Sequence, residues 1–375
     1  MKIAIVQDEL VRKGGAEQVV ISFQNAFPDA PIYTLCYNEK TTYPNFKKSR
    51  VITSWFGKFI KDDINLKRFF YPLGVWAMKS LHLKGYDVVL LSTTHCAKYV
   101  KIDDKTLVIT YCHTPFRLVY RPSSYVEIAH AKKLKSLLYK FIINRLRSID
   151  QKSAKRTNYF ITNATEVVPR IKDAYNPKRE VTVINPPVKC ANFYVSEQID
   201  NYYLVVSRFE PYKKVDLVIR AFNKLSDRNL IIIGQGSMYK DLKVLANSNI
   251  SFLEGLNAED LADKFSKCRA LIFPQHEDYG ITPLEANASG RPVIAYGAGG
   301  VLDTMLPYKN VPGRATAVFF KNQTVDSLID AVEEFEKLNF NPEFIREHAE
   351  NFDEIVFINK IREFVINKYE IHKNE

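Results

Sequence analysis

Short apolar runs alternate with polar, helix-like stretches along this 375-residue chain. This strand–helix–strand rhythm indicates parallel strands, whose sheet must be covered by helices on both faces. The first series of predicted strands is Ile3–Val6, Val88–Leu91, Leu107–Thr110, Tyr159–Thr162 and Val181–Ile184. The second series is Tyr203–Val206, Leu230–Ile233, Ile250–Phe252, Ala270–Phe273, Pro292–Ala295 and Ala317–Phe319. The sequence therefore predicts an α/β fold with two doubly wound, Rossmann-like domains.

A proline pair, Pro186-Pro187, separates the two series. Because proline cannot continue a strand ladder and stiffens a connection, we place the domain boundary there. The predicted domains are residues 1–190 and 191–375, with the last helix free to pack back on the N-terminal domain. Open parallel sheets bind ligands beyond the carboxyl ends of their strands. We therefore expect the two domains to face a central cleft, with the chemistry in the loops that follow strands.

Positive charge is concentrated in the N-terminal half. The net charge is +11, but residues 1–190 hold 32 Lys and Arg against 15 Asp and Glu, whereas residues 191–375 hold 21 against 27. The net +17 of the first half indicates an anionic partner, with plain solubility as the alternative.

Three stretches of the basic half mix cations with apolar residues, and they are 55–61, 67–71 and a predicted helix over 131–156. They suit an anionic membrane surface, although core-facing apolar residues with solvated lysines give the same pattern. The predicted lipid contacts are Lys58, Lys61, Lys67 and Arg68, with Trp55 and Phe56 inserting, together with the basic helix.

Several classes of protein are disfavoured. No run of about 18 apolar residues could span a bilayer, and the amino terminus lacks the features of a signal peptide, so we expect a cytoplasmic protein. The five cysteines are odd in number and scattered, which argues against disulfides and a zinc knuckle. No zinc finger, RNP-like motif or basic tail favours nucleic acid as a partner.

The segment from Phe273 to Tyr296 reads as strand, loop, helix and strand. Thr282 is the predicted N-cap, and backbone amides around Gly280 to Thr282 would attract a phosphate or a sugar hydroxyl at the positive end of the helix. Glu277 in the loop and Glu285 in the first helical turn could accept hydrogen bonds from hydroxyls of one ligand. The alternatives are a solvated loop acid at Glu277 and a capping box between Thr282 and Glu285.

Basic and glycine residues follow other predicted strands. Arg208 follows the strand at 203–206, and Lys213 or its neighbour Lys214 precedes a helix, where cations can pair with a diphosphate. Gly234 and Gly236 form an incomplete dinucleotide fingerprint. In the N-terminal half the loop positions are Gly14, Gly15, His95, His113 and Arg117. Solvated cations, plain turns and structural histidines are the alternatives.

The segment 273–296 resembles the Glu-x7-Glu signature of the family 4 retaining glycosyltransferases, which have the GT-B fold. The string Cys112-His113-Thr114-Pro115 resembles bacterial O-antigen and capsule mannosyltransferases in particular, and 92–98 resembles their Ser-Ser-His…Ala-Lys-Gly loop with departures at Thr94 and Tyr99. The resemblance implies catalytic roles for Glu277, His113, Arg208 and Lys213. It implies acceptor contacts from His95 and Arg117. It implies donor contacts from Gly14, Gly15, Lys214, Gly234, Gly236, Asn257, Tyr279, Gly280, Ile281, Thr282 and Glu285.

The resemblance also implies the reaction. A hexose, mannose from GDP-mannose or else a sugar from a UDP-hexose, would pass with retention to a polyprenyl-linked glycan at the inner face of the plasma membrane. The departing phosphate oxygen would take the acceptor's proton. No Asp-x-Asp motif occurs, so we expect no metal and no cofactor besides the nucleotide sugar. A sugar-nucleotide epimerase and a non-catalytic protein that binds anionic surfaces remain as alternatives.

Overall fold

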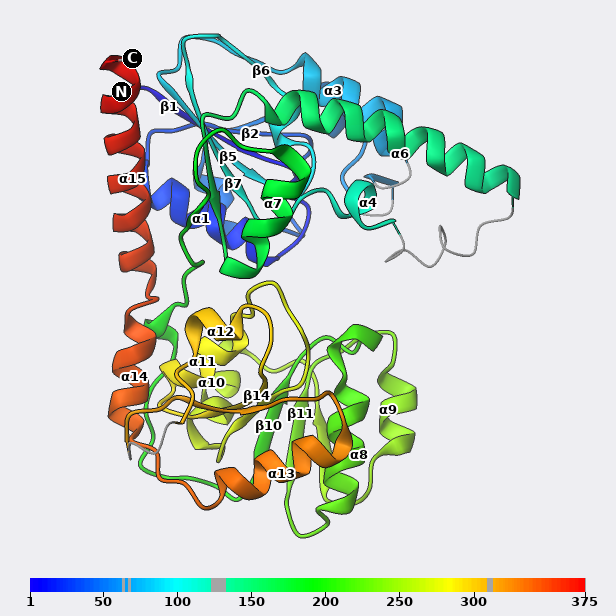
Figure 1. Cartoon of the computed structure of the whole chain (residues 1–375), viewed down its shortest axis with the longest axis vertical. Helices are drawn as coiled ribbons and strands as arrows, with labels where there is room; N and C mark the ends of the chain where they lie inside the picture. The colour runs from blue at the N-terminus through cyan, green and yellow to red at the C-terminus, as the bar shows by residue number, and fades with distance from the viewer. Residues whose placement is uncertain (63–64, 67–68, 123–132, 309–312, 375) are drawn as a thin grey trace. The chain divides into compact units, whose positions relative to one another are not determined.

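A computed structural model describes residues 1–62, 65–66, 69–122, 133–308 and 313–374 (Figure 1). The chain forms two compact units, of which unit 1 comprises Met1–Asn185 with Phe357–Glu375 and unit 2 comprises Pro186–Val356. Helix α15 (Glu354–Asn374) brings the end of the chain to unit 1, where Phe357, Ile361 and Val365 are buried in the core. The division at Asn185–Pro186 coincides with the start of the proline pair.

Unit 1 contains a seven-stranded parallel sheet in the order β3-β2-β1-β5-β7-β8-β9. Its strands are β1 (Ile3–Gln7), β2 (Ile32–Thr34), β3 (Val51–Thr53), β5 (Val88–Thr93), β7 (Leu107–Cys112), β8 (Tyr159–Thr162) and β9 (Thr182–Val183). A separate pair joins β4 (His82–Leu83) to β6 (Lys101–Ile102). In β5, Val88 and Leu90 enter one core while Val89 and Leu91 enter another. The continuous apolar run of this strand thus reflects a sheet that is buried on both faces.

Helices cover both faces of this sheet. Helices α1 and α15 contribute to the core that contains Val88, whereas α3, α4 and α6 contribute to the core that contains Val89. The helices are α1 (Gly15–Ala26), α3 (Val75–Ser80), α4 (Arg117–Tyr120), α6 (Lys133–Ala154) and α7 (Val168–Tyr175). Short helical turns are η1 (Pro44–Lys48), η2 (Trp55–Lys58), η3 (Phe70–Gly74), η4 (Ala97–Tyr99) and η6 (Thr165–Val167).

Unit 2 contains a six-stranded parallel sheet in the order β12-β11-β10-β13-β14-β15. Its strands are β10 (Tyr203–Val206), β11 (Leu230–Ile233), β12 (Ile250–Leu253), β13 (Leu271–Phe273), β14 (Val293–Tyr296) and β15 (Ala317–Phe320). Its helices are α8 (Val215–Lys224), α9 (Tyr239–Leu245), α10 (Ala258–Lys267), α11 (Thr282–Ala288), α12 (Val301–Thr304), α13 (Val325–Phe335) and α14 (Pro342–Glu350), with turns η7 (Cys190–Asn192) and η8 (Pro211–Lys213).

The predicted fold class is confirmed. Every strand predicted from the sequence is present, with bounds that differ by no more than two residues. The prediction missed β2, β3, β4 and β6, which have only two or three residues each, whereas the equally short β9 and β13 lie within apolar runs of four residues in the sequence. All five cysteines are buried and free. Within the described residues, no helix combines the length and the apolar character that crossing a bilayer requires.

A buried ion pair anchors α6 in unit 1. The Nζ of Lys98 lies 2.8 Å from the Oδ1 of Asp150, and neither side chain is more than 1% exposed. Tyr99 and Tyr120 donate hydrogen bonds to the two oxygens of Asp150, at 2.9 and 3.2 Å. Lys98 also donates to the carbonyl oxygen of His95 at 2.7 Å. The carboxyl half of α6 is therefore tied to η4 and α4, and removing one partner of such a pair typically costs about 3–5 kcal/mol.

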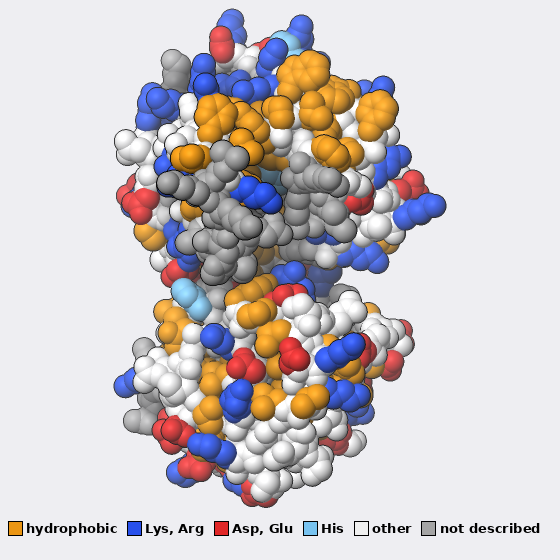
Figure 2. All heavy atoms as spheres, turned by 90° about the vertical axis from the view of Figure 1, so that its right-hand side faces the viewer, with side chains coloured by type: hydrophobic (Ala, Val, Ile, Leu, Met, Phe, Trp, Pro, Cys, Tyr) orange, Lys and Arg blue, Asp and Glu red, His pale blue; other side chains and the backbone are white. Residues whose placement is uncertain are grey.

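The residues predicted from the sequence to contact lipid differ in exposure. Phe56 is only 2% exposed and belongs to the core, so the insertion predicted for it from the sequence is wrong. Trp55 is half-buried. Lys58 and Lys61 are exposed as expected, whereas Lys67 and Arg68 lie outside the described residues. Figure 2 shows hydrophobic side chains gathered on one side of unit 1 with Lys and Arg at their edges.

Candidate functional site

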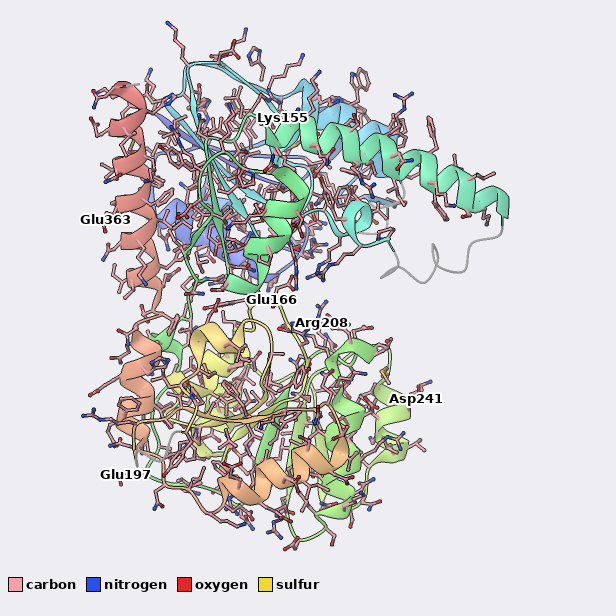
Figure 3. The ribbon with its side chains drawn as sticks, viewed as in Figure 1. Lys155, Glu166, Glu197, Arg208, Asp241 and Glu363 are labelled. Atoms are coloured by element: carbon pink, nitrogen blue, oxygen red, sulfur yellow. The ribbon has the colours of Figure 1, made fainter. Side chains whose placement is uncertain are left out.

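The loops after β10, β13 and β14 of unit 2 converge near the point where the strand order of the sheet changes direction. Strand β10 lies between β11 and β13, so the chain winds outward from β10 in both directions. Such a topological switch point leaves a crevice beyond the carboxyl ends of the strands. The loop after β10 carries Arg208, which Figure 3 labels beyond the strand ends, and the loop after β13 carries Glu277.

Glu277 and Lys213 form an ion pair at this switch point. Their side chains are 22% and 12% exposed, so they are partly shielded but accessible to a ligand. Arg208 donates from Nη2 to the hydroxyl of Tyr212 at 2.8 Å, and Lys213 lies over the Tyr212 ring at 5.2 Å. Lys214, in contrast, is exposed and has left-handed backbone geometry at the start of α8. The structure thus brings Lys213 and Glu277 together and links Arg208 to Lys213 through Tyr212, whereas Lys214 is outside the ion pair.

The backbone of Glu277 is fixed by the glycine pair after β14. Gly300 donates a backbone hydrogen bond to the carbonyl oxygen of Glu277 at 2.9 Å. A Cβ on Gly299 would lie 2.3 Å from that same oxygen, and Gly299 has a φ of +82°. Only glycine permits this approach and this backbone conformation. Gly299 and Gly300 therefore hold the loop that presents Glu277.

Glu285 lies in the first turn of α11 and is half-buried. Burial raises the pKa of its carboxyl to about 7, and no hydrogen bond or ion pair of that carboxyl occurs among the residues that the structure describes. The N-cap is Ile281 rather than the predicted Thr282, and no side chain caps this helix end. The reason is that Gly280, with a φ of +84°, turns the chain early enough for Thr282 to be the first helical residue. The capping box with Glu285 is therefore not formed.

Four other residues of unit 2 that were predicted to bind the sugar donor have structural roles. A Cβ on Gly234 would lie 1.9 Å from the carbonyl oxygen of Ser207, so this glycine lets its strand end pack on the Arg208 loop. A Cβ on Gly236 would lie 2.6 Å from the backbone nitrogen and oxygen of Phe209. Asn257 caps α10 by accepting a hydrogen bond from the amide of Asp260 at 2.8 Å. Tyr279 is buried, and its hydroxyl donates to the carbonyl oxygen of Pro186 at 2.6 Å. Donor contacts of these four residues stay predictions.

Unit 1 has its own switch point, between β1 and β5. Asp8 follows β1 and is buried there. Its two carboxylate oxygens accept hydrogen bonds from the amides of Thr94, His95, Cys96 and Ala97, and from the hydroxyls of Thr93 and Thr94, at 2.5 to 3.1 Å. Burial alone would raise the pKa of Asp8, but neighbouring His95 and these donors hold that pKa well below its usual value. The loop after β5 thus folds around one buried negative charge.

His95 lies between two carboxylates. Its Nδ1 is 3.1 Å from Asp8 Oδ2 and its Nε2 is 3.3 Å from Glu9 Oε2. Burial would lower the pKa of His95, but the nearby acidic groups outweigh it and raise that pKa well above the usual value. Arg12 bonds the other oxygen of Glu9 at 2.6 Å and lies 3.6 Å from Glu17, whose pKa burial raises to about 7. His95 is therefore a largely buried imidazole whose protonated form the neighbouring acids favour.

Asp8, His95 and Cys96 offer ligand atoms within 4.8 Å of one another. The oxygens of Asp8 are already used by six hydrogen bonds. Burial raises the pKa of the Cys96 thiol to about 12, whereas metals bind the thiolate. The chemistry of this cluster therefore fits a hydrogen-bonded support for the loop better than a metal centre.

The other predicted site residues of unit 1 are His113, Gly14, Gly15 and Arg117. His113 is joined to Ser92 Oγ by a hydrogen bond of 2.9 Å, and burial lowers its pKa to about 4, so its ring is neutral near neutral pH. At Gly15 an added Cβ would meet no protein atom within 4 Å, so packing does not explain this glycine, whereas at Gly14 it would meet the Glu17 carboxylate at 2.5 Å. Arg117 is exposed at the start of α4.

Sequence reasoning missed Asp8, Glu9 and Glu17 as parts of this cluster. The available signal was an acidic pair directly after the first predicted strand, at the edge where parallel sheets bind ligands. The predicted site residues thus fall into two sets, one at the switch point of each unit.

Comparison with known proteins identifies the class of this fold. Residues 193–355 match the family model "Glycosyl transferases group 1". The chain is 24% identical to the alpha-1,3/1,6-mannosyltransferase ALG2 of Candida glabrata, over 93% of this chain and 88% of that protein. It is 28% identical to the O-antigen chain mannosyltransferase RfbU of Salmonella typhimurium, over 52% and 57%.

Solved structures with the same fold are more distant in sequence. Sucrose-phosphate synthase of Thermosynechococcus elongatus superposes with a TM-score of 0.74 at 14% identity, covering 99% of this chain and all of that one. Anabaena HepE in complex with UDP gives a TM-score of 0.69 at 15% identity, over 98% and 100%. These neighbours have the GT-B fold.

The raised pKa of Glu285 predicts a pH-dependent stability difference. A folded-state pKa of about 7 lies above the ordinary 4.5, so the folded protein holds this proton more tightly than the unfolded chain. Stability is then lost as pH rises from about 4.5 to about 7, by on the order of 3 kcal/mol. Glu285→Gln should remove this loss, and the ligand-free variant should be more stable than wild type at about pH 8 but not at about pH 4.5. Urea unfolding of both proteins at both pH values measures this difference in the free energy of unfolding.

Glu333→Gln, an exposed glutamate on α13, is the control and should show no such pH-dependent difference. An equal stability difference at both pH values for Glu285→Gln would contradict the assignment.

Proposed function

We propose that this chain is a retaining glycosyltransferase that transfers a hexose from a nucleotide sugar. Support comes from the match of residues 193–355 to the glycosyl transferases group 1 and from the GT-B fold. The observation that carries the proposal is the set of Arg208, Lys213 and Glu277 at the switch point of unit 2. Two cations beside a carboxylate offer groups for the diphosphate and for a sugar hydroxyl in one place.

The proposed donor is GDP-mannose. Its support is the similarity to proteins named as mannosyltransferases, ALG2 and RfbU. A UDP-hexose is the second candidate, because the structural neighbour HepE has been crystallised with UDP and with UDP-glucose. Small differences in a pocket decide which hexose fits, so the choice between them requires a binding measurement.

The proposed mechanism uses charge rather than a covalent intermediate. The bond between the anomeric carbon and the phosphate oxygen breaks, a bond to the acceptor oxygen forms on the same face, and the departing phosphate oxygen takes the acceptor's proton. Negative charge grows on the diphosphate during this step, so Arg208 and Lys213 stabilise the transition state more than the ground state. Glu277 would bind the donor sugar and Glu285 the ribose. The cations take the part of a metal, so no metal is required.

The proposed acceptor is a polyprenyl-linked glycan used in the synthesis of a cell-surface polysaccharide. The name of the relative RfbU, an O-antigen chain mannosyltransferase, supports this class of acceptor. Such an acceptor lies in a membrane, so the enzyme would work at the inner face of the plasma membrane. The net charge of +17 in residues 1–190 is consistent with an anionic lipid surface there.

Nucleotide binding provides the first test. A ligand at one hundred times its Kd stabilises the folded state by about 2.7 kcal/mol. In a thermal-shift titration we expect GDP and GDP-mannose to raise Tm more than UDP and UDP-glucose. A rise in Tm with the uridine nucleotides alone would show that the donor is a UDP-hexose. No rise in Tm with any of the four ligands would refute a sugar-nucleotide site. Incubation with GDP-mannose alone should give at most slow hydrolysis, whereas an epimerase would convert the sugar.

Substitution of the ion pair tests the site itself. We expect Glu277→Gln and Lys213→Met each to lower kcat/KM by about a hundredfold or more, the loss typical of one transition-state contact. The measurement is mannose transfer to a polyprenyl-diphosphate-linked oligosaccharide. Lys214→Met and Glu333→Gln are the matched controls, since both side chains are exposed outside the ion pair.

If Lys214→Met lost activity while Lys213→Met kept it, the diphosphate contact would belong to Lys214. Full activity of Glu277→Gln would exclude the proposed sugar contact.

Metal independence is the third expectation of this mechanism. Because Arg208 and Lys213 neutralise the diphosphate, turnover should be unchanged in excess EDTA. A complete loss that Mg²⁺ or Mn²⁺ restores would show that the cations alone do not serve the leaving group.

A further inference from the structure

Ser92 and His113 meet at the carboxyl edge of the sheet of unit 1. Ser92 lies near the end of β5, and His113 directly follows the neighbouring strand β7. The backbone amide of His113 donates to the carbonyl oxygen of Thr93 at 3.0 Å, which fixes the start of the His113 loop beside β5. The Oγ of Ser92 lies 2.9 Å from the Nε2 of His113. The order of the strands therefore joins two side chains that are 21 positions apart in the chain.

The ring of His113 packs against Tyr111. The two ring centroids are 5.0 Å apart, and the ring planes meet at 57°. Tyr111 is itself buried, and its hydroxyl donates to the carbonyl oxygen of Ile184 at 2.7 Å. Tyr111 is thus a fixed support for the imidazole, and the bond to Ser92 determines which ring nitrogen faces the protein.

The two ring nitrogens of His113 have different surroundings. Within the described part of the chain, Nε2 bonds Ser92 whereas Nδ1 has no hydrogen-bond partner. Nδ1 is not one of the buried polar atoms that lack a partner, so it is accessible to solvent or to a ligand. In His95, by contrast, Nδ1 lies 3.1 Å from Asp8 and Nε2 lies 3.3 Å from Glu9. Of these two histidines, His113 is therefore the one with a ring nitrogen available to a ligand.

The hydroxyl of Ser92 determines where the ring proton of His113 lies. Ser92 is fully buried, and its hydroxyl has no other hydrogen bond among the described residues. If Nε2–H donated to this hydroxyl, the serine proton would be left unpaired in the core, which buried donors avoid. If the hydroxyl donates to Nε2 instead, the ring proton lies on Nδ1, where a ligand can accept it. Burial lowers the pKa of His113 to about 4, so the ring carries a single proton near neutral pH.

We propose that Ser92 is a positioning residue, whose hydroxyl fixes His113 as the Nδ1–H tautomer and leaves this N–H for the ligand. His113 is then a neutral hydrogen-bond donor rather than a general base, and its partner must be an acceptor oxygen of the nucleotide sugar. A neutral donor adds no positive charge beside the anomeric carbon, where positive charge develops during transfer. The contact with the nucleotide sugar rests on the proposed function, whereas the tautomer is a property of the free protein.

Nitrogen NMR of the ligand-free protein tests the tautomer. The full chain is labelled with nitrogen-15 in its histidine rings, because protonated and unprotonated ring nitrogens give distinct signals. The signals that are missing from His113→Ala identify His113 among the seven histidines. In wild type we expect a protonated Nδ1 and an unprotonated Nε2 near neutral pH. In Ser92→Ala no hydroxyl fixes the proton, so the signals should move toward those of a mixture of both tautomers.

Two further variants separate the hydroxyl from general packing. Ser92→Thr retains a hydroxyl and should keep the Nδ1–H tautomer. Ser54→Ala removes another buried serine hydroxyl of unit 1, which donates to the carbonyl oxygen of Leu35 at 2.7 Å, and it should leave the His113 signals unchanged. A protonated Nε2 in wild type, or an unchanged tautomer in Ser92→Ala, would overturn the proposal.

A double-mutant cycle tests whether Ser92 acts through His113. Transfer from the nucleotide sugar is measured for wild type, for Ser92→Ala and His113→Ala, and for the double variant. We expect Ser92→Ala to lower kcat/KM on the order of tenfold in the wild-type background, because the ring is no longer held in place. In the His113→Ala background it should have no further effect, since the hydroxyl then has no ring to position. Equal losses in both backgrounds would show that Ser92 supports only the end of its strand and would refute the positioning role.

The two proposals fail separately. A fixed Nδ1–H tautomer in a protein that transfers no sugar would refute only the proposed function, whereas sugar transfer by a wild-type protein with a protonated Nε2 would refute only the role of Ser92.

Discussion

The carboxylate of Asp8 is the constraint on which the site of unit 1 depends. A buried charge is tolerated only when hydrogen bonds and opposite charge replace its hydration. Here the loop after β5 supplies four amides and two hydroxyls, and His95 supplies an imidazole whose protonated form the neighbouring acids favour. The loop has little freedom to leave this arrangement, because every lost bond would leave the charge less compensated. The position of His95 therefore follows from Asp8, a residue at the end of a different strand.

In unit 2 a different interaction holds the two loops together at the switch point. Both units place two loops side by side at a switch point, after β1 and β5 in one and after β10 and β13 in the other. In unit 2 the partners are Lys213 and Glu277. Both side chains are partly exposed, so each can leave the ion pair and contact a ligand instead. The rigidity comes from the backbone instead, through Gly299 and Gly300 against Glu277. A preformed ion pair of this kind keeps a cation and a carboxylate ready without filling the site permanently.

The sequence predicted what local pattern determines. Strands that lie within apolar runs were found from their pattern, and Glu277 and Lys213 were each singled out from a motif within one loop, although their ion pair was not predicted. The pairs Asp8–His95 and Lys98–Asp150 were not found, because their partners are far apart in the chain and meet only through the order of the strands and the packing of α6. The N-cap at Thr282 failed by one residue because the turn at Gly280 decides where the helix begins. Phe56 was misplaced because its burial depends on the tertiary core.

A buried lysine joins helix α6 to the site of unit 1. Lys98 bonds both Asp150 on α6 and the carbonyl oxygen of His95, so one buried ammonium holds the helix and the loop. Moving α6 relative to this loop would break a buried ion pair, at a cost of about 3–5 kcal/mol. The carboxyl half of α6 and the loop that carries His95 therefore keep one arrangement, and the position of His95 depends on the packing of this helix as well as on Asp8.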